Sequence, residues 1–230
     1  MTATARPLAL VTGASGGVGA AVAAALSATH DVLLGGRDES ALASAAGELP
    51  GSRPWPVDLS DPADLAGAVG GIERLAVLVH SAGVVELGPV AETAAEVWRE
   101  HMEVNVVAVA ELTRLLLPAL RAARGHVVLI NSGQGLAAGA GWGAYAASKF
   151  ALRAYGDVLR AEERALRVTA VYPGRVATAM QRQVRAAEGG DYEPERYLRP
   201  ESVATAVLSA VSATDDAHPT ELVLRPGEHR

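Results

Sequence analysis

The chain has 230 residues, half of them hydrophobic, with a formal net charge of −6 and no cysteine; this allows one buried domain, residues 1–230, and excludes disulfides and thiolate metal sites. Its charges are scattered without a run of one sign, so neither nucleic acid nor a metal ion is predicted as a partner. No apolar segment approaches the roughly 20 residues that span a bilayer, so we expect a cytoplasmic protein with no membrane partner.

The first predicted unit is a strand, a glycine-rich turn and a helix. Residues 8–12 are apolar, and Gly13-Ala14-Ser15-Gly16-Gly17-Val18-Gly19 leads into an alanine-rich helix ending near residue 28. Glycines let the backbone turn sharply and approach a pyrophosphate, which the N–H groups of the helix N-terminus would bind. Simple punctuation is the alternative, because the spacing differs from the common G-x-G-x-x-G. The residues predicted to bind a dinucleotide here are Gly13, Ser15, Gly16, Gly17, Val18 and Gly19.

The end of the second predicted strand, residues 31–36, indicates which dinucleotide binds. NAD-binding folds place an acidic residue at this point, where the chain instead has Gly36 followed by Arg37. A guanidinium pairs with a 2′-phosphate by charge-assisted hydrogen bonds, and the Ser15 hydroxyl would add to it. The sequence therefore favours NADP(H) over NAD; Asp38 argues against this, and a solvated Arg37 is the alternative.

Two more strand ends are predicted to contact the cofactor. The strand at 54–57 leads to Asp58 and Leu59, and the Asp58 carboxylate either accepts from an adenine amino group or starts the next helix. The strand at 75–79 leads to His80, which we expect to be structural and to be the one histidine near the site. The small residues that follow would let the cofactor lie against the backbone; they are Ser81, Ala82 and Gly83.

A long amphipathic helix is expected over about residues 93–120, with an apolar stripe that is mostly core. Asn105 lies in its middle, where a polar residue of modest helix propensity needs a reason. One interpretation is a hydrogen-bonded core amide. The other is a disturbed backbone that holds a water molecule for a proton relay.

Three side chains suggest proton transfer to a carbonyl oxygen. Tyr145 and Lys149 are four residues apart, so they lie on one face of a predicted helix, although this spacing alone is typical of an exposed pair. The buried strand at 126–131 delivers Ser132 to its carboxyl end, where open α/β sheets bind ligands. This setting favours a catalytic interpretation of all three.

The C-terminal part contains a predicted strand at 167–172, a helix at 201–213 and a short strand at 221–224. Residues 179–199 between them have weak periodicity and are predicted to form a mobile lid. Arginines 182, 185 and 196 in this lid hint at an anionic substrate, such as a hydroxy acid or a carrier-linked acyl group. Solvated charges are the alternative.

Taken together, Gly13 to Gly19, Asn105, Ser132, Tyr145-x-x-x-Lys149 and Pro173-Gly174 make the chain resemble the short-chain dehydrogenase/reductase family over nearly its whole length. The resemblance implies a Rossmann-type α/β fold, with a doubly wound seven-stranded parallel sheet and helices on both faces. Two features depart from the family pattern. Ser81 replaces the asparagine of Asn-Ala-Gly, and the C-terminus lacks Asp-Gly-Gly, which favours a homodimer through the helices at 93–120 and 146–164 over a tetramer.

The resemblance also assigns roles. Tyr145 would be the general acid for carbonyl reduction or the base for alcohol oxidation, and Ser132 would hydrogen-bond the substrate oxygen. Lys149 would bind the nicotinamide ribose and, with the oxidised nicotinamide, lower the phenol pKa from about 10 toward 7. Asn105 would anchor the relay water. Further cofactor contacts would come from Asn105, Tyr145, Lys149, Pro173, Gly174, Val176 and Thr178, the last two at the positions that hold the carboxamide.

These features predict an NADP(H)-dependent carbonyl reductase that interconverts a small-molecule ketone or aldehyde and an alcohol. One alternative is a dinucleotide-sensing module without chemistry, which loss of Tyr145 or Lys149 would have indicated. Another is a sugar-nucleotide epimerase or dehydratase, for which the roughly fifty residues after Thr178 leave little room.

Overall fold

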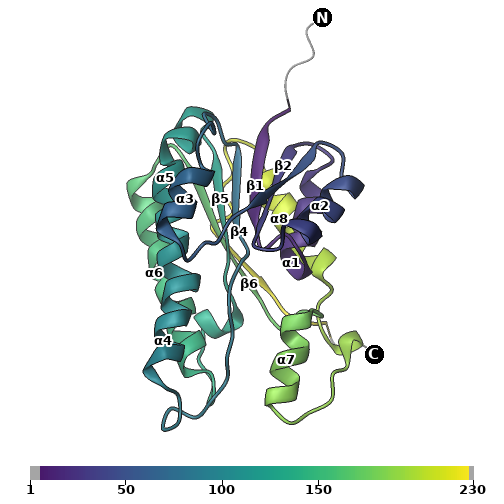
Figure 1. Ribbon diagram of the computed structural model, residues 1–230, viewed down its shortest axis with the longest axis vertical. Helices are drawn as coiled ribbons and strands as arrows, with labels where there is room; N and C mark the ends of the chain where they lie inside the picture. Colours follow the sequence, from purple (N-terminus) through teal and green to yellow (C-terminus); the bar gives the residue numbers. More distant parts are fainter. Residues whose placement is uncertain (1–5, 228–230) are drawn as a thin grey trace, which may run out of the picture.

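A parallel sheet forms the centre of the computed structural model, which describes residues 6–227 (Figure 1). Its seven strands lie in the order β3-β2-β1-β4-β5-β6-β7. They are β1 (Leu8–Thr12), β2 (Asp31–Gly36), β3 (Ser52–Pro56), β4 (Val77–His80), β5 (His126–Ile130), β6 (Arg167–Pro173) and β7 (Glu221–Leu224). The chain adds β2 and β3 on one side of β1 and all later strands on the other. The carboxyl ends of β1 and β4 therefore meet at a switch point, where such sheets bind ligands.

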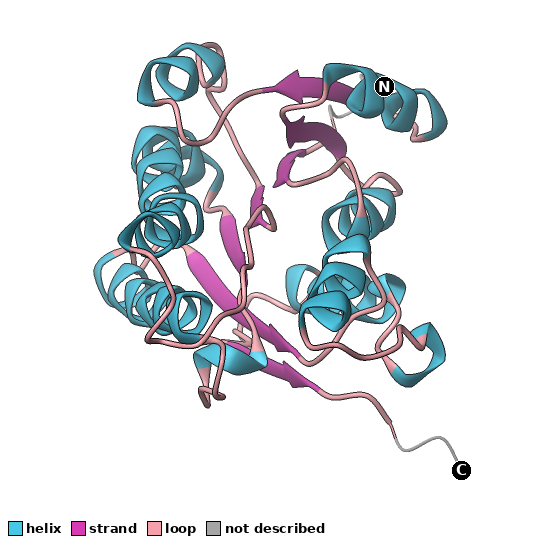
Figure 2. Cartoon of the chain, turned by 60° about the horizontal axis from the view of Figure 1, so that its bottom comes forward, coloured by secondary structure: helices cyan, strands magenta, loops and turns pink. Residues whose placement is uncertain are grey.

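Helices cover both faces of the sheet, as Figure 2 shows. One face carries α1 (Gly17–Leu26), α2 (Glu39–Glu48) and α8 (Pro200–Val211). The other carries α3 (Pro62–Ala68), α4 (Ala95–Met102), α5 (Ala108–Ala123) and α6 (Gly143–Glu162). In Figure 1, α7 (Ala179–Ala187) lies below the sheet, across from the lower ends of α4 and α6. The predicted doubly wound α/β architecture is confirmed.

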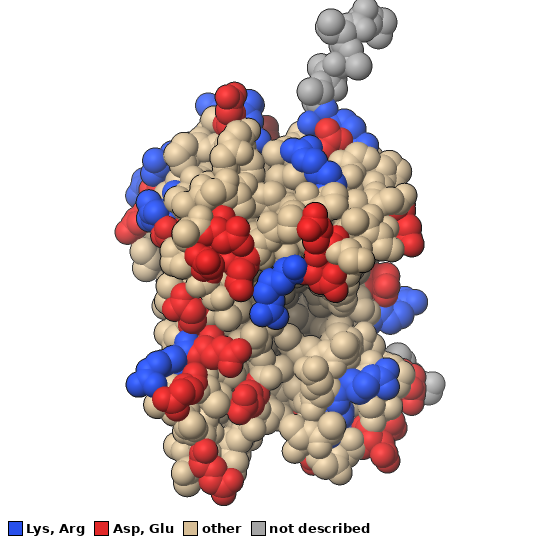
Figure 3. Space-filling model, viewed as in Figure 1, with Lys and Arg blue, Asp and Glu red and all other residues tan. Residues whose placement is uncertain are grey.

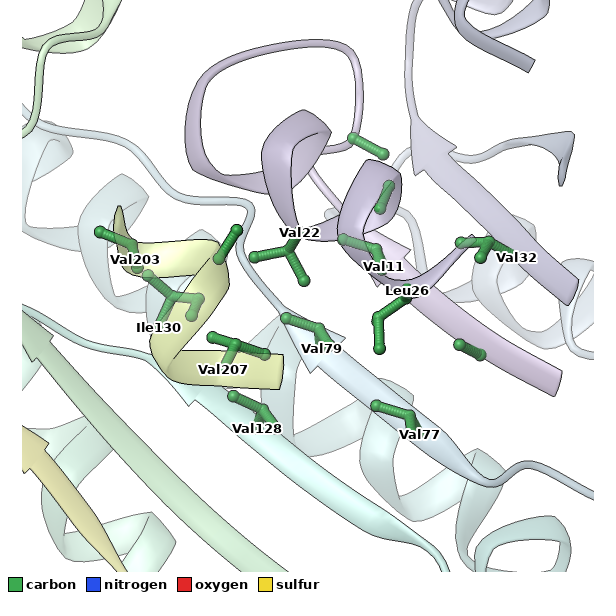
Figure 4. Packing of buried hydrophobic residues seen from close by; sticks show 14 of the residues in the cluster. Val11, Val22, Leu26, Val32, Val77, Val79, Val128, Ile130, Val203 and Val207 are labelled. Carbon is green, nitrogen blue, oxygen red and sulfur yellow. The ribbon is translucent and has the colours of Figure 1, made fainter. Parts of the chain in front are cut away.

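Each face of the sheet has its own apolar core, because successive strand residues point to opposite faces. Val11, Val79 and Val207 of α8 belong to one core (Figure 4). Leu10 and Leu78, their neighbours along the chain, belong to the other core, beneath α3, α5 and α6. Burial of both faces explains why these strands are continuous apolar runs in the sequence.

The helix expected over residues 93–120 is present from Ala95 to Ala123, but its middle is not α-helical. α4 ends at Met102, Glu103–Val107 form a π-helical segment, and α5 then runs to Ala123. Asn105 lies within this segment, which confirms the predicted disturbance of the backbone. Single turns of π-helix within α-helices often occur at functional sites.

The segment at 179–199 contains more regular structure than its weak periodicity indicated. It holds α7 and a 3-10 turn at Pro194–Arg196, joined by residues 188–193. Elsewhere the element bounds differ from the prediction by a few residues. Across residues 6–227, every helix is too short or too polar to cross a lipid bilayer.

Candidate active site

A cavity of about 570 Å³ lies at the carboxyl ends of the strands. Figure 3 shows one face of the molecule hollowed near its middle, with basic and acidic side chains close by. Most of the predicted site residues line the cavity: Gly13, Ser15, Gly16, Gly17, Val18, Gly19, Ser81, Ala82, Gly83, Ser132, Tyr145, Lys149, Pro173, Gly174, Val176 and Thr178. The predicted residues outside the lining are Arg37, Asp58, Leu59 and Asn105.

The structure brings Ser132, Tyr145 and Lys149 together. Ser132 follows β5, while Tyr145 and Lys149 lie one turn apart on α6. The Lys149 Nζ atom is 5.7 Å from the centre of the Tyr145 ring, and Ser132 lines the same cavity as both residues. A hydroxyl, a phenol and an ammonium thus face one space, as a proton transfer to a bound oxygen requires.

Burial is the main cause of the pKa shifts of Tyr145 and Lys149. It raises the pKa of the Tyr145 phenol, and the hydrogen bond with Ser132 only opposes the rise. Burial lowers the pKa of Lys149 to about 8, and its ammonium donates to the Ile130 carbonyl at 3.1 Å. The protein without cofactor therefore does not lower the Tyr145 pKa as expected, because the rise caused by desolvation of the phenol exceeds the lowering by Ser132. Tyr145 is a neutral phenol, ready to donate a proton.

Asn131 holds α6 against the sheet. Its buried side chain donates to the Lys149 carbonyl at 3.0 Å and accepts from the Ser132 N–H at 2.7 Å. One amide thus fixes the backbone of two candidate site residues, Ser132 and Lys149, that are far apart in the sequence. The sequence analysis missed this role, although a polar residue at the end of a buried apolar run was a usable signal.

Asn105 lies behind the cavity wall and is fully paired with protein groups. Its Oδ1 accepts from the Val84 N–H at 2.9 Å, and its Nδ2 donates to the Val84 carbonyl and to Ser148 Oγ at 3.1 and 3.0 Å. A Cβ atom at Gly83 would lie 2.9 Å from Asn105 Oδ1, so this position needs glycine. These contacts match the core-amide interpretation, and Asn105 joins the loop after β4 to α6.

Thr12 joins the strand ends at the switch point, where Ser81 departs from the family pattern. Its hydroxyl accepts from the N–H groups of Ser81 and Ala82, both at 3.1 Å. Gly13 has a φ of 68°, and a Cβ atom there would lie 2.9 Å from the Ala82 backbone. The glycine turn can therefore approach the end of β4 closely, and Thr12 supplies the side-chain link between the two strands.

Of the charged residues after β2 and β3, the two aspartates Asp38 and Asp58 make local hydrogen bonds, whereas Arg37 forms no salt bridge with a described residue. Asp38 caps α2 by accepting from the Ala41 N–H at 2.9 Å, and Asp58 accepts from both the N–H and the hydroxyl of Ser60. These hydrogen bonds, helped by the charge of Arg37, lower the pKa of Asp58. The local helix-start interpretation thus accounts for the contacts of Asp58. Within the described residues, no carboxylate lies within salt-bridge distance of Arg37.

His80 is not the histidine nearest the site, so that expectation was wrong. The buried His101 ring packs edge-on against Tyr145, with 6.3 Å between the ring centres. Its Nε2 accepts from the Glu86 N–H at 3.0 Å, which leaves Nδ1–H to donate to the Val97 carbonyl at 2.7 Å. His101 therefore fixes one side of the Tyr145 ring. His80 is buried and hydrogen-bonded to Thr113 at 2.9 Å, as a structural residue would be.

α7 forms the wall opposite α6. Thr178 caps this helix by accepting from the Gln181 N–H at 3.2 Å, and Met180, Gln181 and Val184 line the cavity. The buried Gln181 Nε2 has no hydrogen-bond partner among the described residues. The lining also includes two arginines that the sequence analysis did not select, Arg175 and Arg225.

The lid arginines, in contrast, are engaged outside the cavity lining. Arg182 stacks on the Tyr192 ring at 4.3 Å, Arg185 pairs with Glu188 at 2.6 Å, and Arg196 pairs with Glu193 at 3.1 Å. The hint that these arginines bind an anionic substrate is not supported by their contacts.

Comparison with known proteins matches the chain to dehydrogenases and reductases. The family model described as "short chain dehydrogenase" matches residues 7–189. The chain is 35% identical to the "Glycine betaine reductase ATRR" of Emericella nidulans, over 95% of this chain but only 18% of that protein. It is 34% identical to the "Uncharacterized short-chain type dehydrogenase/reductase y4eK" of Sinorhizobium fredii, over 95% and 91% of the two chains. The solved structure of an alcohol dehydrogenase from the archaeon Thermococcus sibiricus, complexed with 5-hydroxy-NADP, superposes with a TM-score of 0.88 at 26% identity, covering 97% and 98% of the chains.

Proposed function

The chain belongs to the short-chain dehydrogenase family of oxidoreductases, and we propose that it uses NADP(H) to interconvert a ketone or aldehyde with the corresponding alcohol. The observation that carries the proposal is the shared cavity, which joins the glycine turn after β1 to Ser132, Tyr145 and Lys149. A binding module without chemistry has no need of this group. After Thr178, the described chain folds onto the same sheet through α8 and β7, which disfavours the epimerase alternative.

The cavity fits a dinucleotide. No side chain caps the N-terminus of α1 and its first turn has no acidic residue, so its N–H groups are available to a pyrophosphate. Among residues 6–227, no Asp or Glu lines the cavity, so an anionic cofactor meets no like charge from them there. The choice of NADP(H) rests on Arg37, which has no carboxylate partner among the described residues, while Asp38 is engaged as the cap of α2.

The mechanism follows from the positions of the three side chains. When bound, the nicotinamide supplies the hydride to the carbonyl carbon, or accepts it in the reverse direction. Ser132 hydrogen-bonds the substrate oxygen and orients it toward Tyr145. The Tyr145 phenol donates its proton to that oxygen, which gives the alcohol and leaves a phenolate. The Lys149 ammonium, buried without a carboxylate in the cavity lining, stabilises this phenolate until solvent returns the proton.

The predicted lid and homodimer remain part of the proposal. We expect residues 179–199 to close over bound substrate, since α7 contributes part of the cavity wall. Val107, Phe150 and Val158, on the α4 to α6 side, are 48%, 41% and 53% exposed, which supports pairing of two chains through these helices. The cytoplasmic location remains a prediction.

Titration of the purified protein with NADPH and NADH, followed by nucleotide fluorescence, tests the cofactor. We expect NADPH to bind at least about tenfold more tightly, because the Arg37 guanidinium forms charge-assisted hydrogen bonds with the 2′-phosphate. Arg37→Ala should remove most of this difference while leaving NADH binding unchanged. Equal affinities in the unaltered protein would refute the NADP preference, and binding of neither nucleotide would refute the proposed function.

A further inference from the structure

Arg225 follows the last strand, β7, and lines the cavity. Its Nη1 donates to the carbonyls of Tyr172 and Leu224, at 3.1 and 3.0 Å. A Cβ atom at Gly133 would lie 3.6 to 3.7 Å from Cζ, Nη1 and Nη2 of this arginine. The guanidinium therefore lies beside the residue that follows Ser132, and two backbone carbonyls fix its orientation.

The charge of Arg225 is not neutralised by the protein. The other lining arginine, Arg175, forms a two-bonded pair with Glu188, at 2.6 and 2.8 Å. Arg225 has no ion pair with any described residue, and its Nε and Nη2 have no protein acceptor there. Since no Asp or Glu lines the cavity, the guanidinium faces a space without a counter-charge.

We propose that Arg225 binds a carboxylate of the substrate, so that the enzyme acts on oxo acids and hydroxy acids. This inference rests on the proposed function, because it takes Ser132 and Tyr145 as the groups that hold the reacting oxygen. A guanidinium presents parallel N–H donors that match the two oxygens of a carboxylate. With Nη1 held by the backbone, the remaining donors are preorganised, which lowers the entropy cost of binding.

The position of Arg225 separates this role from cofactor phosphate binding. The glycine turn and the N-terminus of α1 hold the pyrophosphate in the proposed complex, whereas Arg225 lies beside Gly133 and Gly174. The lid arginines do not compete for the substrate, since each is engaged outside the cavity lining. Arg182, stacked on Tyr192, therefore provides a matched control for the loss of one arginine near the site.

A direct test compares two ketones that share a reacting carbonyl, acetoacetate and its neutral methyl ester. We expect the ratio of kcat/KM for the acid to that for the ester to fall about 10- to 100-fold in Arg225→Gln, as for loss of a hydrogen-bonded charged partner. Arg182→Gln should leave the ratio unchanged. An unchanged ratio in Arg225→Gln would overturn the inference.

A binding measurement decides the question without turnover. Malonate is titrated by calorimetry into the unaltered protein and both variants, with and without NADP⁺. We expect malonate to bind the unaltered protein and Arg182→Gln alike, and Arg225→Gln at least about tenfold more weakly. Failure of malonate to bind, equal binding by all three proteins, or loss of NADP⁺ affinity in Arg225→Gln would each contradict the assignment. Failure of the proposed function is a different result: no NADPH binding, or no hydride transfer to acid or ester.

Discussion

The two walls of the cavity are held in place by different forces. The α6 wall is fixed by buried side chains, because Asn131 bonds the Lys149 carbonyl and Asn105 bonds Ser148. The α7 wall is held by more exposed interactions, among them the pair of Arg175 with Glu188. Buried, fully paired polar groups specify one arrangement, whereas surface ion pairs contribute little stability. The α6 wall, which carries Tyr145 and Lys149, is therefore called the rigid wall here.

The largest effect is expected on the rigid wall, from Tyr145→Phe. This change keeps the ring that packs against His101 but removes the proton donor, which typically contributes 10²- to 10⁴-fold to a rate. We expect kcat for NADPH-dependent ketone reduction to fall about 10³-fold, with NADPH affinity and the unfolding transition little changed. A rate within tenfold of the unaltered enzyme would show that another group donates the proton.

Next in size is the difference between one substitution on each wall. Asn131→Ala leaves the Lys149 carbonyl and the Ser132 N–H without their partner in a buried site, at a cost of about 2 to 4 kcal/mol in the free energy of unfolding. Glu188→Gln breaks the partly exposed pairs with Arg175 and Arg185 on the other wall and should cost less than about 1 kcal/mol. Urea unfolding of both variants measures the contrast, and equal losses would contradict the different attachment of the walls.

A further expected effect is a dependence of stability on pH that arises in the sheet behind the rigid wall. Burial lowers the pKa of His80 to about 3, so the folded protein keeps this ring neutral while the unfolded chain binds a proton below about pH 6.5. Stability is therefore full above that pH and declines as the pH falls toward 3, by about 1.4 kcal/mol per unit for this group.

His80→Gln provides the control for this prediction. Urea unfolding between pH 7 and 5 should show a shallower decline in the variant than in the unaltered protein. Because His126, with a pKa also lowered to about 3 by burial, remains in the variant, part of the slope should persist. Identical slopes would mean that His80 is protonated in the folded protein.

The rigid wall was also the more predictable one, for a physical reason. Tyr145, Lys149 and the glycine turn are read from local spacing, and the strands from continuous apolar runs. The π-helical segment around Asn105 was indicated by one polar residue in an apolar stripe. Each of these signals is carried by residues that lie only a few positions apart in the sequence.

What the sequence did not reveal depends on contacts between distant segments. His101 reaches Tyr145 only because α4 packs on α6, and Arg225 reaches Gly133 only because β7 joins the edge of the sheet next to β6. The lid arginines were chosen from the sequence because three of them occur in one short segment. The pairing of Arg185 with Glu188 and of Arg196 with Glu193 depends on how that segment folds. Side-chain partners across such distances are set by the topology.

The proposed reaction is the transfer of a hydride from NADPH to a carbonyl carbon. The most direct measurement supplies NADPH carrying deuterium at the transferable C4 position together with methyl acetoacetate, and examines the product by NMR. We expect one deuterium on the carbinol carbon of the product alcohol, and an amount of product equal to the NADPH consumed. With Tyr145→Phe we expect almost no product over the same time. An alcohol without deuterium from either face of the labelled nicotinamide, or equal product with Tyr145→Phe, would contradict it.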